Sequence, residues 1–426
     1  MNAEPFVKVD AAMRQPGKHF LQIPGPTNVP DRILRAIDHP TIDHRSEKFA
    51  ELGQACLEGL KGIFQITDGH VFIFPASGTG AWEAAMVNTM SPGDRVLMFE
   101  TGQFATLWRK VAQRFGLIVD FIPGDWRHGV DPEAIEAKLR EDSSHEIKGV
   151  LCVHNETSTG VTSRISDVRR AIDAAQHPAL LMVDMVSSLA SIDCRTEDWG
   201  VDVAISGSQK GLMLPPGLGL NAASNKALVT AKSARLPRSY WSWEDMLDSN
   251  RNGFFPYTPA TNLLYGLREA IQMLQEEGLL NVFRRHARHG EATRRAVQAW
   301  GLEIVCLDQR EYSNSLTAVL MPDGFDEAAF RQTVLQNFNL SLGSGLGKFS
   351  GRAFRIGHLG DLNDLMLCAT LCGIEMGLKK TGIPHHPGGL GAAMDYLTSN
   401  QAASDASRPS PAHPAATTRQ REFSSR

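Results

Sequence analysis

One lysine stands where an apolar run ends. Residues 201–210 read V-D-V-A-I-S-G-S-Q-K, which predicts a buried strand and a Ser/Gly turn that ends at Lys210. In open α/β sheets, ligands bind beyond the carboxyl ends of the strands. Residues 211–219, G-L-M-L-P-P-G-L-G, are apolar and would help to desolvate the amine, which lowers the pKa of a lysine and lets it act as a nucleophile or base. The alternative is a surface lysine after a turn.

An aspartate ends another apolar run. Residues 179–184 read A-L-L-M-V-D, and M-V-S-S follows Asp184. A carboxylate in this position must meet a cation or several hydrogen-bond donors. A protonated pyridine nitrogen is such a cation, and it makes pyridoxal phosphate (PLP) an effective acceptor of electrons. The alternative is that Asp184 caps the next segment through its own side chain. Taken with Lys210, the aspartate favours PLP held as a Schiff base on that lysine.

A strand, a loop of small residues and a helix start follow one another at residues 71–82, V-F-I-F-P-A-S-G-T-G-A-W. Glycines allow close approach of the backbone, and the free N–H groups and dipole of a helix start attract a phosphate. The hydroxyls of Ser77 and Thr79 add donors. An ordinary capped helix is the alternative. The loop has the glycine spacing of neither a dinucleotide fingerprint nor a Walker loop.

Two polar segments are expected near the same site. Residues 154–160, H-N-E-T-S-T-G, follow a predicted strand, so their hydroxyl and amide groups should lie at the same edge of the sheet. Residues 352–360, R-A-F-R-I-G-H-L-G, place an arginine on a short strand, where it could grip a carboxylate with two hydrogen bonds or form a surface ion pair.

Two other patterns are set aside. Residues 343–349, G-S-G-L-G-K-F, are not a nucleotide-binding loop, because Leu342 stands where that motif needs glycine and Phe349 where it needs Ser or Thr. The six cysteines form no C-x-x-C pair and are expected to be buried thiols, so neither a metal site nor a redox pair is predicted. They are Cys56, Cys152, Cys194, Cys306, Cys368 and Cys372.

The elements that must position these residues form an α/β pattern. Short apolar runs are expected as strands at residues 71–74, 95–99, 117–121, 148–153, 179–183, 201–206 and 219–223. Amphipathic helices are expected between them at residues 81–90, 104–115, 132–140 and 166–176. This alternation predicts a mainly parallel sheet covered on both faces. Its strand order cannot be read from the sequence.

A smaller α+β domain is expected after a long helix at residues 261–277. Its elements are a helix at 282–300, apolar runs at 302–307 and 316–321, a helix at 326–337, a strand near 354–356 and a helix at 362–379. The predicted organisation is an N-terminal arm (1–22), a large PLP-binding domain (23–278), a small C-terminal domain (279–382) and a Gly/Pro/Ser-rich tail (383–426) whose end is disordered.

The composition is that of an ordinary folded domain. The 426 residues are 42% hydrophobic and 21% charged, with a net charge of −4, which gives no electrostatic attraction for nucleic acid or an anionic membrane. No signal peptide or long apolar span is present, so a cytoplasmic protein is expected.

Together these segments resemble the class V aminotransferases of PLP fold-type I, the aspartate-aminotransferase-like fold. The resemblance covers residues 23–397 and rests on P-G-P-T-N, S-G-T-G-A-W-E-A, H-N-E-T-S-T-G, V-D-M-V-S-S, S-G-S-Q-K-G and F-R-I-G-H-L-G in this order. The H-R-S at 44–46, the segment 258–270 and the G-G-L-G-A-A-M-D-Y-L stretch are closer to the serine–glyoxylate branch than to the alanine–glyoxylate branch.

The resemblance implies a role for each matching residue. Lys210 would carry PLP and later move the Cα proton, Asp184 would pair with the pyridine nitrogen, and Thr157 would contact the ring hydroxyl. Arg355 would bind the substrate carboxylate, with Gly25 nearby. The remaining cofactor contacts implied are Ser77, Gly78, Thr79 and Gln209 at the phosphate, Phe104 over the ring, and Thr258 from a neighbouring subunit. Phe255 stands where some relatives carry a tyrosine that reaches the phosphate, and Tyr257 could substitute for it.

The implied activity is transfer of an amino group from serine to glyoxylate by a ping-pong mechanism, giving hydroxypyruvate and glycine in a homodimer or larger homo-oligomer. It would belong to glycine and serine-cycle or photorespiration-like metabolism. Alanine or aspartate as donor, a cysteine desulfurase and a non-catalytic PLP-fold binding protein are the alternatives. A serine hydrolase is excluded because no G-x-S-x-G is present.

Overall fold

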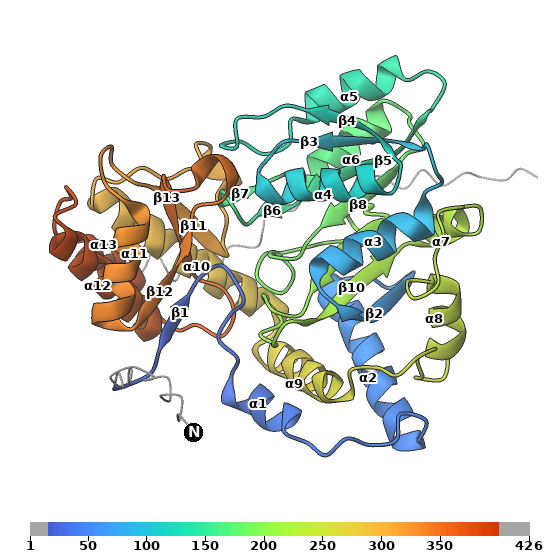
Figure 1. The fold of residues 1–426 in the computed structure, drawn as a ribbon, viewed down its shortest axis with the longest axis horizontal. Helices are drawn as coiled ribbons and strands as arrows, with labels where there is room; N and C mark the ends of the chain where they lie inside the picture. The colour runs from blue at the N-terminus through green and yellow to red at the C-terminus, as the bar shows by residue number, and fades with distance from the viewer. Residues whose placement is uncertain (1–15, 400–426) are drawn as a thin grey trace, which may run out of the picture.

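A computed structural model describes residues 16–399. Its centre is a seven-stranded sheet in the order β2-β10-β9-β8-β5-β3-β4, in which β10 alone runs antiparallel to its neighbours (Figure 1). The strands are β2 (His70–Ala76), β3 (Arg95–Phe99), β4 (Ile118–Ile122), β5 (Ile147–Val153), β8 (Leu180–Asp184), β9 (Val203–Gly207) and β10 (Gly217–Ala223). The expected mainly parallel sheet is therefore present.

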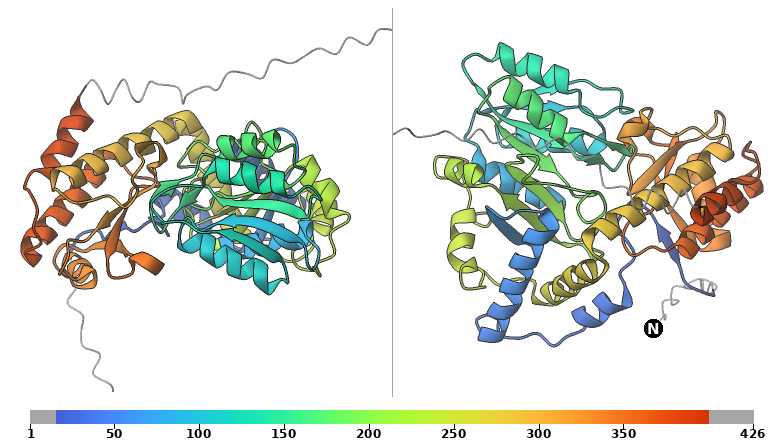
Figure 2. Two further views of the ribbon diagram at one scale, coloured as in Figure 1. Left: turned by 90° about the horizontal axis from the view of Figure 1, so that it is seen from above. Right: turned by 180° about the vertical axis from the view of Figure 1, so that it is seen from behind.

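Alternate side chains of each strand pack on opposite faces of this sheet. In β2, Val71 and Ile73 belong to one apolar core, and Phe72 and Phe74 belong to the other. Helices cover both faces (Figure 2, left). One face packs against α2 (Glu47–Phe64), α5 (Pro132–Glu141), α6 (Ile165–Ala174) and α9 (Thr261–Glu277). The other packs against α3 (Gly78–Thr89), α4 (Gln103–Arg114), α7 (Asn225–Ala231) and α8 (Trp243–Asn250).

A second, four-stranded sheet in the order β1-β12-β13-β11 forms its own core with four helices (Figure 1). Its strands are β1 (Phe20–Gln22), β11 (Leu316–Leu320), β12 (Leu340–Ser344) and β13 (Ala353–Gly357). The helices are α10 (Leu279–Ala299), α11 (Glu327–Phe338) and α12 (Asp364–Thr381), with α13 (Gly389–Thr398) packed on α10 and α12. Helix α1 (Asp31–Ile37) follows β1 in the sequence and packs against α9.

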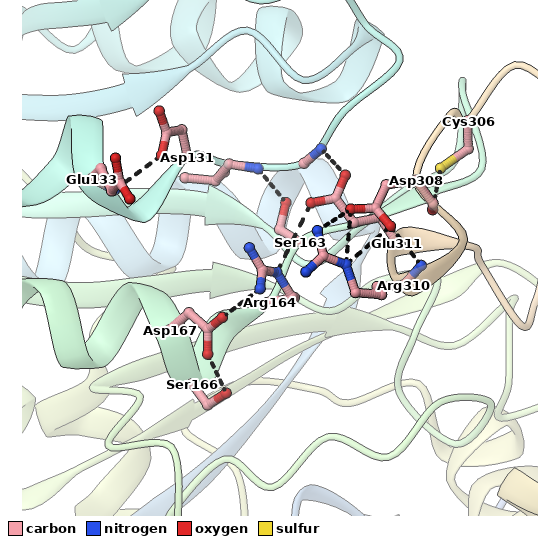
Figure 3. Close-up of polar contacts among 12 residues, drawn as sticks. Asp131, Glu133, Ser163, Arg164, Ser166, Asp167, Cys306, Asp308, Arg310 and Glu311 are labelled. Atoms are coloured by element: carbon pink, nitrogen blue, oxygen red, sulfur yellow. Dashed lines mark hydrogen bonds and ion pairs between the residues drawn. The ribbon is translucent and has the colours of Figure 1, made fainter. Parts of the chain in front are cut away.

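A polar network joins the small domain to the large one (Figure 3). The 3-10 helix η1 (Gln309–Glu311) precedes β11 and ends at a buried carboxylate, which accepts a hydrogen bond from the Gly129 N–H at 2.8 Å. The same carboxylate of Glu311 lies 4.0 Å from the Arg164 guanidinium, which also pairs with Asp167 at 2.9 Å. Next to it, the short hairpin β6 (Asn155–Glu156) and β7 (Val161–Thr162) bridges to Tyr312.

The structure gives three segments a form that the sequence pattern did not specify. Residues 302–307, expected as an apolar run, contribute an isolated bridge between Ile304 and Val319, and the Arg127 side chain donates to the carbonyls of Ile304 and Val305. Residues 20–22, expected only as part of an N-terminal arm, form strand β1, which pairs in parallel with β12. Residues 389–398, predicted as tail, form α13. The predicted disordered end, from 400 onward, lies outside the described residues.

Within residues 16–399, no helix combines the length and the apolar character needed to cross a membrane.

Candidate active site

Four strand ends meet at one edge of the large sheet. Strands β2, β9, β8 and β5 run parallel to one another, so their carboxyl ends lie together. A cavity of about 190 Å³ opens there. Its lining residues are Ser77, Gly78, Thr79, Trp82, Phe104, Val153, Asn155, Thr157, Asp184, Val186, Gln209 and Lys210. The site predicted from scattered motifs is thus one cavity, at the sheet edge where open α/β folds bind ligands.

The Lys210 amine is buried in this cavity and donates a hydrogen bond to the Pro24 carbonyl. Burial, and secondarily the positive charge of Arg355, lower the pKa of Lys210 to about 7, against the opposing effect of Asp184. The loop that carries the lysine is tied to the P-G-P-T-N segment, since Thr27 donates to the carbonyls of Gln209 and Lys210 at 3.1 and 3.2 Å. The amine is therefore held in place and partly neutral near pH 7.

Asp184 is the last residue of β8, and its carboxylate is buried. One oxygen accepts from the Val186 N–H at 2.7 Å and the other from the Trp82 indole at 2.9 Å. Burial raises the pKa of Asp184 to about 7, opposed mainly by those two hydrogen bonds. A buried carboxylate with so little compensation is suited to a cationic partner in the cavity.

Helix α3 begins at the cavity. Ser77 is its N-cap, and the Ser77 hydroxyl accepts from the Gly80 N–H at 3.4 Å. The N–H groups of a helix's first turn have no partner within the helix and can bind a phosphate. The Gln209 side chain lines the cavity beside this turn, and its amide oxygen, an acceptor, is buried without a hydrogen-bond partner among residues 16–399. The NH₂ group of the same amide is the part that can donate to a phosphate. A Cβ at Gly78 would approach the Val186 side chain to 2.7 Å, so any larger residue there would require Val186 to move.

A buried glutamate positions the aromatic residue beside the cavity. The Glu156 carboxylate accepts from the N–H groups of Phe104 at 3.2 Å and Ala105 at 3.2 Å, at the start of α4, and from the Ser158 N–H and hydroxyl at 3.0 and 2.7 Å. Burial raises the pKa of Glu156, and these hydrogen bonds oppose that rise. The glutamate thus caps α4 and sets where the Phe104 ring lies.

Arg355 reaches the site from β13 of the second sheet. The side chain is buried, and it donates to the Ser344 carbonyl at 2.7 Å and the Thr157 carbonyl at 2.8 Å. Burial lowers the pKa of Arg355 to about 10, so it remains charged at neutral pH. The rejected loop 343–349 contributes here, because Gly343 pairs with Arg355 between β12 and β13. That segment therefore supports the arginine.

Two predicted contacts lie away from the cavity in the single chain. Tyr257 stacks on Tyr240, with ring centroids 4.4 Å apart, and Thr258 is exposed. Neither lines the cavity of the single chain, and the contact of Thr258 from a neighbouring subunit stays a prediction. Gly25 adjoins the site, since a Cβ there would lie 2.5 Å from the Lys210 nitrogen.

Sequence reasoning missed Trp82, Glu156, Pro24 and Ser344 as parts of the site. Trp82 and Glu156 lie within the motifs S-G-T-G-A-W and H-N-E-T-S-T-G, which were assigned to the site. Their place in these motifs could have indicated that they belong to it. The carbonyls of Pro24 and Ser344 left no signal, because any residue supplies a carbonyl.

The fold is that of the fold-type I aminotransferases. A solved ureidoglycine–glyoxylate aminotransferase from Bacillus subtilis matches with a TM-score of 0.84 and 26% identity, over 91% of this chain and all of that one. A pyridoxamine–pyruvate aminotransferase from Mesorhizobium loti matches with a TM-score of 0.83 and 27% identity, over 90% of this chain and 99% of the other.

The sequence places the chain within that class. The family model "Aminotransferase class-V" matches residues 19–347, and the chain belongs to this family of transaminases. A serine–glyoxylate aminotransferase of Methylorubrum extorquens is 51% identical over 92% of this chain and 98% of its own length. An L-aspartate–glyoxylate aminotransferase of Paracoccus denitrificans is 45% identical over 89% and 96%, respectively. The resemblance inferred from the motifs is confirmed.

Proposed function

We propose that this transaminase moves the amino group of serine to glyoxylate, with PLP bound at Lys210, and releases hydroxypyruvate and glycine. The observation that carries the proposal is the cavity in which a buried, partly neutral lysine and a buried aspartate lie at adjacent strand ends, next to an arginine. The donor and acceptor are proposed from the relatives of Methylorubrum extorquens, Hyphomicrobium methylovorum and Arabidopsis thaliana, which are 47–51% identical.

The cavity residues fit PLP. The first turn of α3 with Ser77, Gly78 and Thr79 suits the phosphate, to which the Gln209 side-chain NH₂ group would donate. The cofactor contacts proposed beyond that turn are Asp184 at the pyridine nitrogen, Phe104 against the ring, Thr157 at the ring hydroxyl, Lys210 at the aldehyde carbon, and Tyr257 and Thr258 from a neighbouring subunit. When bound, PLP supplies an aldehyde that condenses with amines and a ring that takes up the electrons left at Cα.

Lys210 carries the proton transfers. Its pKa of about 7 makes the free amine a base near neutral pH, when an unperturbed lysine would be protonated. The Pro24 carbonyl holds the amine on the side of the cavity where the P-G-P turn lies. We therefore propose that the Lys210 amine takes the proton from Cα of the amino acid and returns it.

Arg355 orients the substrate by its carboxylate. Its Nε and one terminal nitrogen are engaged by the carbonyls of Ser344 and Thr157, which holds the guanidinium plane beside the cavity. Serine, glycine, glyoxylate and hydroxypyruvate all carry a carboxylate, so a single arginine can serve both half-reactions. We propose that Gly25 keeps this end of the cavity narrow, which suits small substrates.

A cysteine desulfurase is disfavoured by the thiols. Cys306 lies beside the network that joins the two domains (Figure 3), and burial raises its pKa to about 12, which disfavours the reactive thiolate at neutral pH. A solved cysteine desulfurase from Thermococcus onnurineus shares the fold at 14% identity. Aspartate remains the rival donor, given the relative from Paracoccus denitrificans.

The test is a panel of amino donors with glyoxylate as acceptor. The purified protein, loaded with PLP, is given serine, alanine or aspartate, and glycine and each keto acid are quantified. Serine should give equal amounts of glycine and hydroxypyruvate and the highest kcat/KM. Turnover with aspartate or alanine but none with serine would overturn the donor assignment, and no glycine from any donor would overturn the proposed function.

A further inference from the structure

A tryptophan outside the predicted site residues contacts the aspartate that defines the site. Trp82 lies one turn into α3, and its indole N–H donates to the Asp184 carboxylate at 2.9 Å. Trp82 is 3% exposed and Asp184 is 4% exposed, so both partners of this hydrogen bond are buried. The same helix begins with the turn that suits a phosphate, so α3 links both ends of the cavity.

The Trp82 ring is fixed by a second tryptophan. Trp108 of α4 stacks on Trp82, with ring centroids 5.8 Å apart and planes at 12°. Trp108 is fully buried, and its own indole N–H has no hydrogen-bond partner within the described residues. The two rings therefore share one apolar environment and one stack, but only the Trp82 N–H contacts a charged group.

Asp184 depends on few groups to remain ionised. Its hydrogen bonds come from the Val186 N–H and Trp82. The ionisable groups that act on it are Glu156, which disfavours the anion, and Lys210, which favours it. In a buried site, a hydrogen bond to the charged form of an acid stabilises that form. The indole N–H is the only side-chain donor to the Asp184 carboxylate in the described part of the chain.

We propose that Trp82 is a positioning residue for transamination: its indole N–H orients the Asp184 carboxylate and keeps it anionic, so that it can hold a protonated pyridine nitrogen. This inference rests on the proposed function for the identity of the cofactor. The coupling between Trp82 and Asp184 itself is a property of the unloaded chain.

The test compares Trp82→Phe with Trp108→Phe. Both changes remove an indole from the same stack, but only Trp82→Phe removes a hydrogen bond. The affinity of the apoprotein for PLP is measured at pH 8 by fluorescence quenching. It should fall by roughly tenfold to a hundredfold in Trp82→Phe and by less than about threefold in Trp108→Phe. Equal losses in the two variants would overturn the proposal, because packing alone would then explain them.

A second readout uses the apoproteins alone. Asp184 has a folded pKa raised to about 7, so the folded state binds more protons than the unfolded state, and stability falls as pH rises until that pKa is passed. Removing the indole should raise that pKa further. Lys210, whose folded pKa is lowered to about 7, adds the same rise in stability above pH 7 to both variants. The melting temperature of Trp82→Phe should therefore drop further below that of Trp108→Phe as pH rises above 7.

The outcomes separate the two claims. If the wild-type protein fails to bind PLP, the proposed function is wrong, and the melting profiles alone decide whether Trp82 controls Asp184. If PLP binds to the wild-type protein and the profiles of the two variants run parallel at all pH values, the inference about Trp82 is wrong and the proposed function stands.

Discussion

Replacing Gly25 with alanine should displace the catalytic amine of Lys210 and leave the protein folded. Gly25 has φ +99°, and an added Cβ would lie 2.4 Å from Cδ and 2.5 Å from Nζ of Lys210. Ordinary van der Waals contact begins at 3.4 Å, so the lysine side chain must retreat by about 1 Å. The atoms that must move are the far end of a flexible side chain, so the protein should still fold.

The expected effect of Gly25→Ala has two parts, one on stability and one on rate. Placing an L side chain at this positive φ costs about 1–2 kcal/mol of stability. A displacement of about 1 Å in a reacting group costs roughly 100-fold in rate. Gly25→Ala should therefore lose a modest part of its stability and roughly 100-fold in kcat with serine and glyoxylate. The retreat also takes the amine from the Pro24 carbonyl, which adds to the misplacement.

The matched control is Gly93→Ala. Gly93 has φ +83°, but a Cβ there meets nothing within 4 Å. The two variants should therefore melt at similar temperatures, while only Gly25→Ala loses activity. Stopped-flow measurement of the first half-reaction with serine would locate the loss in the step that Lys210 serves. Wild-type kcat in Gly25→Ala, or an equal loss of kcat in Gly93→Ala, would refute the claim that the P-G-P turn fixes the position of the Lys210 amine.

Other predictions concern the same cavity. Lys210→Ala should still fold and show no transamination; borohydride reduction followed by peptide mapping should label residue 210 only in the wild type. Arg355→Lys loses the planar fork and should raise KM for both serine and glyoxylate by roughly tenfold or more, with PLP affinity nearly unchanged. In the apoprotein, Lys210 should react with an amine-selective reagent half-maximally near pH 7, because its lowered pKa leaves the reactive neutral form above that value; a midpoint near 10 would contradict the burial argument. Glu156→Ala leaves the buried N–H groups of Phe104, Ala105 and Ser158 without an acceptor and should lower stability by about 3 kcal/mol in thermal unfolding.

Much of the site was predictable because its chemistry lies at the ends of local segments. Lys210, Asp184 and the Ser77 turn each follow an apolar run directly, so the pattern that predicts a strand also predicts where its last side chain will lie. The length and apolar character of the strands indicated a parallel sheet in the same way. The pattern said less where it was ambiguous. Residues 302–307 are an apolar run, but their conformation depends on an isolated bridge to β11 and on contacts with the distant Arg127 side chain.

The sequence by itself determined which residues could do chemistry and at which strand or helix end each would stand, since these follow from apolar periodicity and short motifs. Only the tertiary structure decided which of them meet. The hydrogen bond from Trp82 to Asp184 spans 102 positions, and the contact from Arg355 to the Thr157 carbonyl spans 198. Such contacts depend on strand order and on the docking of one sheet against the other. Those are set by packing between surfaces distant in the chain, which no local pattern encodes.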